Sequence, residues 1–447
     1  MMRFAPALLI VAALALLRAA PAEAVTIEKV ESPGGITAWL VEDHSVPVVS
    51  TSIAFRGGAA LDPDDKAGLA TFAADLLDEG AGDLDSTAYQ SKLEDLAASL
   101  DFDVDQDDIS VRLRSLSANL GEAYDLLRLA LTEPRFDPAP VARLRAELLD
   151  SLSRDLHQPQ ALAYRLWMKT SFDGSPYARS TRGTPQSIEA ITPDDMRGLV
   201  KARFAKDVLV IGVVGDITPA ALKPLLDKTF GGLPAHAAPD KLGDIALRRS
   251  DAVVVSNLPV PQSVVVFGQQ GIKRNDPDWY AALIDLNILS SGGLTSRVAL
   301  EVREQRGLAY SVSASLDPLR HAGLILGQVA SRNARVAQAI DLIRQQWRSM
   351  HDTGPTAKEL AAAKTYLTGS FPLNLDSTAR IASILVSMQL DHLGIDYLDR
   401  RAALIDEVTL ADAKRVARRL LEPDGLFFVV VGAPANLSAA RRVAPIE

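Results

Sequence analysis

The sequence predicts an α+β fold made of two homologous α/β-sandwich domains, one structural unit used twice. Three observations support this prediction. The chain has 447 residues, more than one hydrophobic core usually supports. Its composition, 48% hydrophobic and 23% charged, is ordinary for a globular protein. Strand-like segments and amphipathic helices alternate along the chain in an order that repeats, which favours two similar sheets covered by helices.

The first 24 residues have the pattern of a secretory signal peptide. A basic start at Arg3 is followed by an apolar stretch over 4–17, and Ala22-Glu23-Ala24 fits a small-x-small cleavage site. The apolar stretch is too short to span a bilayer comfortably, and no later segment approaches that length. We therefore predict a periplasmic protein cleaved after residue 24, with no stable membrane span after cleavage. An uncleaved N-terminal anchor is the alternative.

One pair of elements occurs twice, at an offset of 217 residues. Thr192 precedes a predicted helix that leads into an apolar strand ending at Gly215. Thr409 and Gly432 occupy the same places in the second copy. Both threonines stand where an N-cap hydroxyl accepts hydrogen bonds from the first free amides of a helix. This repeat predicts a duplicated scaffold.

A segment rich in glycine, proline and small residues separates the two copies, as expected of a linker. We predict an N-terminal domain over 25–233, a linker over 234–248 and a C-terminal domain over 249–447. Within the C-terminal domain, Thr356 to Glu359 has the pattern of a capping box at a helix start.

Composition and missing motifs exclude several function classes. The chain has no cysteine, so it has no disulfide, thiolate metal ligand or cysteine nucleophile. Its formal charge of −9, without a long basic run, argues against nucleic acid as a partner. It contains no P-loop, no G-x-G-x-x-G and no G-x-S-x-G elbow, so nucleotide binding and serine hydrolysis find no support.

Metal sites also find little support in the residues. No two of the histidines lie within one helical turn, whereas a catalytic zinc normally has three protein ligands; they are His44, His157, His236, His321, His351 and His392. The acidic run 101–108 resembles the start of a calcium loop, but the sixth position is Gln106 and the twelfth is Arg112. A strand with Phe102 and Val104 facing inward fits this run better.

Residues 287–316 form the most informative motif. They read NILSSGGLTSRVALEVREQRGLAYSVSASL and closely resemble the C-terminal-half signature of the pitrilysin/insulinase family of zinc peptidases. The resemblance implies that Arg303 and Tyr310 contact substrate at a zinc site on the other half of a clamshell. The residues alone leave an alternative open. Tyr310 shares one face of a predicted strand with alternate positions up to 316, which suits a core residue, and Arg303 has charged neighbours, which suits a helix surface.

The family's zinc motif, H-x-x-E-H, belongs in the N-terminal half, and here the matching stretch over 66–80 lacks it. The two histidine positions are Thr71 and Asp75, and the glutamate position is Ala74. By the same resemblance, the distal glutamate ligand falls near Ser151, with Glu147 as the nearby acid. The resemblance therefore predicts no metal in this chain.

The resemblance covers nearly all of the chain from residue 25 onward and implies half of a clamshell. It predicts the non-zinc subunit of a heterodimeric peptidase that degrades peptides. The partner would be a homologous subunit that binds zinc, and Arg303 and Tyr310 would act in trans on its active site. The alternative is a catalytically inactive protein of the same fold that binds peptides or serves as a scaffold. An independent hydrolase with a new site has no supporting set of residues.

Overall fold

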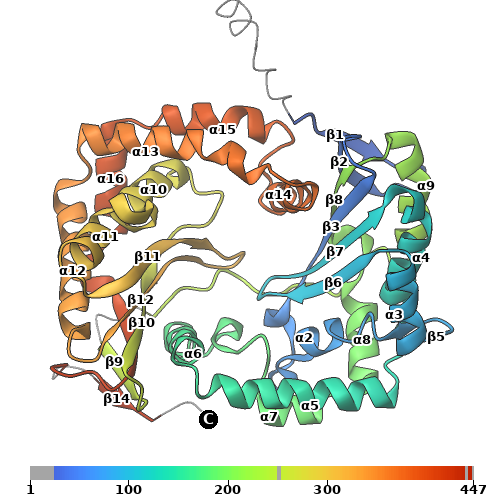
Figure 1. Ribbon diagram of the computed structural model, residues 1–447, viewed down its shortest axis with the longest axis horizontal. Coiled ribbons are helices and arrows are strands. Elements are labelled where there is room, and N and C mark those ends of the chain that lie inside the picture. Colours follow the sequence, from blue (N-terminus) through green and yellow to red (C-terminus); the bar gives the residue numbers. More distant parts are fainter. Residues whose placement is uncertain (1–24, 249–252, 438–440, 445–447) are drawn as a thin grey trace, which may run out of the picture.

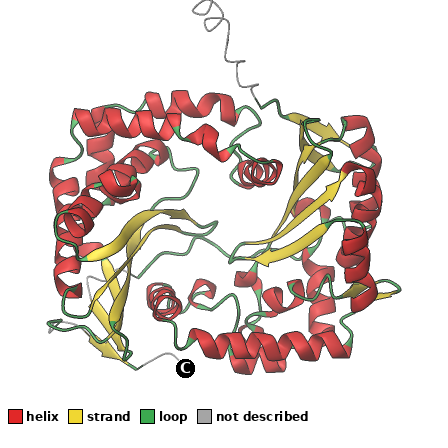
Figure 2. Ribbon diagram, viewed as in Figure 1, coloured by secondary structure: helices red, strands yellow, loops and turns green. Residues whose placement is uncertain are grey.

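The computed structural model describes residues 25–248, 253–437 and 441–444, so the predicted signal peptide lies outside the described residues. Within them, two six-stranded sheets stand on opposite sides of the molecule, with most helices on their outer sides (Figure 1, Figure 2). In the described part of the chain, no helix combines the length and the apolar character needed to cross a membrane.

The first sheet has the strand order β1-β2-β8-β3-β7-β6. The central strand β3 pairs antiparallel with β7 and β8, while β2 and β8 run parallel. The strands are β1 (Glu28–Glu31), β2 (Thr37–Glu42), β3 (Val48–Arg56), β6 (Ser99–Val104), β7 (Asp108–Leu116) and β8 (Leu209–Gly215); a separate small hairpin joins β4 (Gly80–Ala81) and β5 (Leu84–Asp85).

The second sheet has the order β11-β12-β10-β13-β9-β14. Its central strand β10 again pairs antiparallel with two neighbours, and β9 and β13 run parallel. The strands are β9 (Val253–Asn257), β10 (Gln262–Gln270), β11 (Ala309–Pro318), β12 (Gly323–Arg332), β13 (Phe427–Gly432) and β14 (Arg441–Val443). The two sheets share one topology except at the outer edge, where β1 is antiparallel to its neighbour and β14 is parallel. The predicted α+β fold with a duplicated unit is confirmed.

The helices begin where local side chains satisfy their free amides. Thr192, Thr409 and Thr356 each accept a hydrogen bond from the third residue of the following helix in a capping box, as predicted. The helices of the first half are α2 (Leu69–Ala74), α3 (Ser86–Asp95), α4 (Leu120–Thr132), α5 (Pro138–Asp155), α6 (Pro159–Ser171), α7 (Pro185–Ala190), α8 (Pro193–Arg203) and α9 (Pro219–Phe230). Those of the second half are α10 (Trp279–Leu286), α11 (Arg297–Ala299), α12 (Val336–Thr353), α13 (Ala357–Gly369), α14 (Thr378–Leu390), α15 (Tyr397–Asp406) and α16 (Leu410–Leu420).

The two halves exchange one helix each across the centre of the molecule. Helix α6 packs its apolar face on β10 and β13 of the second sheet, and α14 packs on β3 and β8 of the first (Figure 1). The approach of α14 requires Gly212, because a Cβ atom there would lie 2.6 Å from the Ala382 carbonyl oxygen. Gly268 has the same role beside Trp167 of α6. The hydrophobic core therefore crosses the predicted domain boundaries, which themselves stay a prediction.

Candidate functional site

Tyr310 lies on the surface because β11 contains a bulge. Ala309 pairs with Ser331, and Val312 pairs with Val329, so β11 has one more residue than β12 between these two pairs. The extra residue breaks the alternation of faces: Ala309 and Val312 are buried, whereas Tyr310 is 84% exposed. The alternative interpretation, in which Tyr310 lies on the buried face of the strand as a core residue, is therefore wrong.

Arg303 lies beside this tyrosine in a π-helical turn, η8 (Leu300–Glu304). Its guanidinium carbon is 5.0 Å from the centroid of the Tyr310 ring, within the range of a cation–π contact. Its Nε also lies 3.2 Å from a carboxylate oxygen of Glu304. A second π-helical turn, η6 (Asn287–Ser291), begins the same motif. Single π-helical turns of this kind often occur at functional sites.

The positions of the zinc motif hold no helix of the required length. Helix α2 ends at Ala74, and Asp75 is its C-terminal cap, so the chain turns away where the motif would continue. The Thr71 hydroxyl donates to the carbonyl oxygen of Thr181 at 2.6 Å, and Ala74 is buried. The first motif position is thus bonded to the loop that precedes α7.

An arginine from that loop connects the remaining motif positions. Arg182 donates from Nη2 to the Ser151 hydroxyl and from Nη1 to the Asp155 carboxylate, both at 2.6 Å. Asp75 keeps contact with solvent, yet the surrounding protein raises the pKa of its carboxyl to about 6, against the opposing effect of Arg182. Glu147, expected near the distal ligand position, instead lies 3.3 Å from Arg143 on the exposed side of α5.

These residues do not fit a catalytic zinc, which normally has three nitrogen, sulfur or carboxylate ligands from the protein. The motif positions offer two hydroxyls and one carboxylate, beside a guanidinium that would repel a cation. Over the residues that the structure describes, no group of three or more His, Asp or Glu side chains is placed to hold a metal ion. Sequence reasoning missed Arg182 and Asp155, because neither belongs to the motif.

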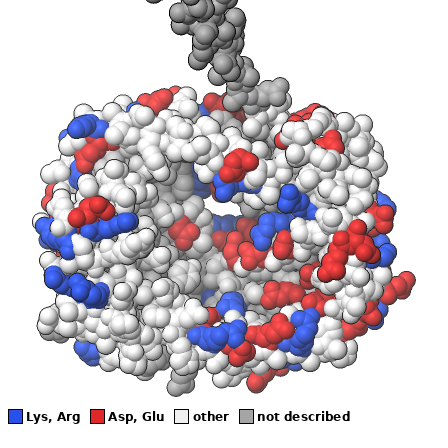
Figure 3. All heavy atoms as spheres, viewed as in Figure 1, with Lys and Arg blue, Asp and Glu red and all other residues white. Residues whose placement is uncertain are grey.

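A cavity of about 1110 Å³ lies at the centre of the molecule, and neither Arg303 nor Tyr310 lines it. The tips of the hairpins β6–β7 and β11–β12 meet there, together with α6 and α14. Figure 3 shows this hollow with acidic and basic side chains around it. The strand prediction for the acidic run is confirmed, since β6 points Leu100, Phe102 and Val104 inward, and the run then ends in the hairpin tip.

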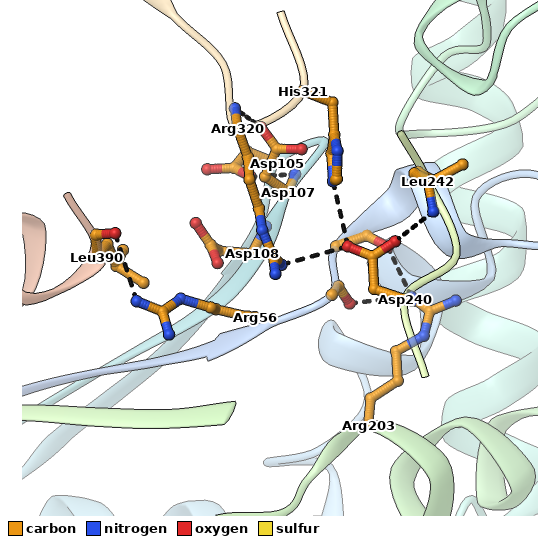
Figure 4. A network of polar contacts seen from close by, with 12 residues as sticks. Arg56, Asp105, Asp107, Asp108, Arg203, Asp240, Leu242, Arg320, His321 and Leu390 are labelled. Carbon is orange, nitrogen blue, oxygen red and sulfur yellow. Dashed lines mark hydrogen bonds and ion pairs between the residues drawn. The ribbon is translucent and has the colours of Figure 1, made fainter. Parts of the chain in front are cut away.

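Polar contacts join the two hairpin tips (Figure 4). Asp107 accepts hydrogen bonds from the Tyr177 hydroxyl and from the backbone N–H of Arg320, the latter at 2.8 Å. The neighbouring His321 places its Nε2 3.1 Å from the carboxylate of Asp240, which belongs to the segment between the sheets. Because Asp107 and His321 come from different halves, this network links the halves at the cavity.

Asp108 stands in the same network between two arginines. Burial and the neighbouring Asp105 and Asp107 raise the pKa of its carboxyl to about 7, against the effect of Arg320 and Arg56. Arg56 itself donates to the backbone carbonyl of Leu390 at 3.3 Å, at the end of α14 (Figure 4). The cavity wall thus contains an acid that changes its charge near neutral pH.

The fold and site define a class of protein: a duplicated α+β chain with an exposed tyrosine beside an arginine, in a motif that resembles one of the zinc peptidases, and no ligand set at the zinc-motif positions. Comparison with known proteins assigns the family. The sequence matches the insulinase description of peptidase family M16 over residues 37–185 and the M16 inactive-domain description over residues 190–367. The chain belongs to peptidase family M16.

Individual relatives differ in the function that their names give. The chain is 25% identical over 392 residues to the non-peptidase homolog YmxG of Helicobacter pylori, a match that covers 87% of this chain and 90% of that protein. It is 26% identical to the uncharacterized zinc protease ML0855 of Mycobacterium leprae, with 68% and 69% covered. A crystal structure of a peptidase M16 inactive domain from Pseudomonas fluorescens superposes with a TM-score of 0.86 at 26% identity, covering 95% of this chain and all of that one.

Proposed function

We propose that this chain is the catalytically inactive, non-zinc subunit of a two-chain periplasmic metallopeptidase that degrades peptides. One observation carries the proposal: the Arg/Tyr pair is displayed on the surface, while the zinc-motif positions hold Thr71, Ala74 and Asp75. A chain that presents substrate-binding groups without a metal needs the metal from a second chain. The matches to a non-peptidase homolog and to an inactive domain support this division.

In the proposed complex, a homologous partner with an intact H-x-x-E-H motif would hold the zinc, which would supply an activated water. The guanidinium of Arg303 carries several N–H donors, and the Tyr310 hydroxyl carries one O–H donor. Both would donate hydrogen bonds to the scissile carbonyl oxygen as it gains negative charge. Stabilising a developing oxyanion in this way lowers the barrier of the chemical step.

The first test uses the purified complex and measures peptide hydrolysis. Arg303→Ala and Tyr310→Phe should each lower kcat, by roughly 10–1,000-fold if they act as oxyanion donors. Assembly, followed by size-exclusion chromatography, should be unchanged, because both side chains lie at the surface. Tyr366→Phe serves as the control, since Tyr366 is also an exposed tyrosine and lies outside the motif. Unchanged kcat in both motif variants would contradict the assignment of Arg303 and Tyr310 to the active site.

A second candidate function is supported by a different observation. The central cavity is large, lined by charges of both signs, and formed by this chain alone. It suits a protein that captures peptides without cleaving them. In that case the isolated chain would bind a ligand without any partner.

A further inference from the structure

The backbone at the zinc-motif positions keeps the spacing that a pair of metal ligands needs. The Asp75 N–H donates to the Thr71 carbonyl oxygen at 3.0 Å, so these two positions lie one α-helical turn apart at the end of α2. Side chains four positions apart on a helix lie on the same face. The difference from a metal site therefore lies in the side chains themselves and in the residues opposite them.

The loop that precedes α7 packs tightly against the start of α2. A Cβ atom on Gly68 would lie 2.8 Å from the backbone carbonyl carbon of Arg182, and one on Gly183 would lie 2.2 Å from the Ala67 carbonyl oxygen. The Ser187 hydroxyl donates to this same Ala67 oxygen at 2.7 Å. Because the two backbones are in close contact and hydrogen-bonded, the position of Arg182 beside α2 is fixed.

The Arg182 side chain interacts with both parts of the zinc-motif region. Its guanidinium donates to the Ser151 hydroxyl and to the Asp155 carboxylate, which lie one turn apart on α5. Its charge also acts on the Asp75 carboxyl, where it opposes the surrounding protein, which raises the pKa to about 6. One guanidinium thus faces the distal ligand position and the second histidine position of the motif.

The charges around Arg182 favour the guanidinium over a metal ion. The ion pair between Arg182 and Asp155 spans 2.6 Å, and the Asp155 side chain is only 19% exposed. Burial lowers the pKa of the Arg165 guanidinium on α6; Asp155 opposes this effect and Arg182 adds to it, so a second cation lies close to this pair. A divalent cation would meet two positive side chains here and would have to displace Arg182 from its partners.

We propose that the guanidinium of Arg182 stands in the place of the metal and excludes zinc from this chain, so that restoring the ligands alone does not restore a tight zinc site. This inference rests on the proposed function and deepens it, because it identifies the group that keeps this chain a non-zinc subunit. Its test measures zinc binding by the isolated chain, without partner or peptide. A failure here and a failed hydrolysis assay are therefore distinct results.

The experiment introduces a ligand set into the isolated chain with Thr71→His, Asp75→His and Ser151→Glu, together called the restored-ligand variant. Zinc affinity is measured by competition with a chromophoric chelator, and zinc content by mass spectrometry after dialysis. With Arg182 kept, this variant should bind zinc at least about 100-fold more weakly than the same variant carrying Arg182→Met. The variant with Arg182→Met should hold about one zinc ion per chain.

Two further substitutions in the restored-ligand variant separate charge from other effects. Arg182→Lys keeps the positive charge without the planar fork, so zinc binding should stay weaker than with Arg182→Met. Arg154→Met is the matched control, because Arg154 is an arginine of α5 whose ion pair with Asp150 is exposed. It should leave zinc affinity unchanged, and circular dichroism should show that every variant is folded.

A smaller change tests the same inference if the restored-ligand variant does not fold. Thr71→His with Asp75→His alone places two histidines four positions apart, and adding Arg182→Met should raise zinc affinity at least about tenfold. Two results would overturn the inference. One is equal zinc affinity with and without Arg182 in either set of variants, and the other is a folded restored-ligand variant with Arg182→Met that binds no zinc.

Discussion

At the scale of single residues, one extra position in β11 decides where Tyr310 points. Regular alternation predicts that Tyr310 shares the buried face of Val312, and only the bulge turns it outward. The alternation of buried and exposed residues can be read from a sequence, but a bulge depends on how two strands pair. The resemblance of the motif to the family therefore identified Tyr310, whereas the alternation pattern placed it on the wrong face. Arg303 was identified in the same way, and its position over the tyrosine ring comes from the structure.

We expect Asp285 of α10 to make the stability of the fold depend on pH. Its carboxyl is buried, and burial raises the pKa of this group to about 8 from 3.8, against the opposing effects of the Arg297 charge and the Ala417 backbone. Between these values the folded chain keeps a proton that the unfolded chain releases, so rising pH lowers stability. Asp285→Asn removes this dependence. The variant's stability relative to the unmodified chain should rise from pH 5 to 8, by up to about 1.4 kcal/mol per pH unit.

Thermal unfolding at several pH values measures this directly. The Tm difference between Asp285→Asn and the unmodified chain should widen steadily as pH rises and level off above about pH 8. Parallel Tm profiles for the two proteins would show that the carboxyl ionises in the folded state as it does in the unfolded chain.

Arg182 hydrogen-bonds to two side chains at the positions that correspond to the family's zinc motif and next to it. Arg182→Met should lose its bonds to Ser151 and Asp155 and lower the free energy of unfolding by roughly 1–2 kcal/mol, a value reduced for its partial exposure. Arg154→Met is the control, because its ion pair with Asp150 is exposed on both sides and should contribute little. Urea denaturation distinguishes the two. Equal losses would mean that Arg182 is an ordinary surface residue.

At the scale of elements, the sequence predicted helix starts better than helix partners. Thr192 and Thr409 could be assigned as caps because capping depends on residues three positions apart. The exchange of α6 and α14 could not be predicted, because an apolar helix face does not reveal which sheet it will cover. Gly212 and Gly268 mark the crossings only once the helices are seen above them.

The exchange predicts that α14 stabilises the first sheet. Leu385 is fully buried against this sheet, so Leu385→Ala should lower the free energy of unfolding by about 2–5 kcal/mol. Leu373→Ala, at a leucine that is 72% exposed, should change it by less than about 0.5 kcal/mol. Chemical denaturation gives both values. A small loss at Leu385 would mean that α14 contributes little to the fold.

At the scale of the whole molecule, duplication was visible in the sequence and the cavity was not. The repeat of Thr192 to Gly215 at 409–432 predicted two similar units, and the two sheets confirm it. The cavity arises where two hairpin tips from different halves meet, and Asp107 and Arg320, which are hydrogen-bonded there, lie 213 positions apart in the sequence. The acidic run over 101–108 was the one local signal of this region.

The central claim is that this chain completes a zinc peptidase made by a second chain. The most direct measurement is to isolate the tagged chain from the cells that produce it, identify proteins that co-purify, and assay zinc and peptide hydrolysis in the same sample. The account predicts a stoichiometric partner with H-x-x-E-H, zinc in the complex, and hydrolysis that the chain alone lacks. Recovery of the chain alone, without zinc or hydrolysis, would contradict it.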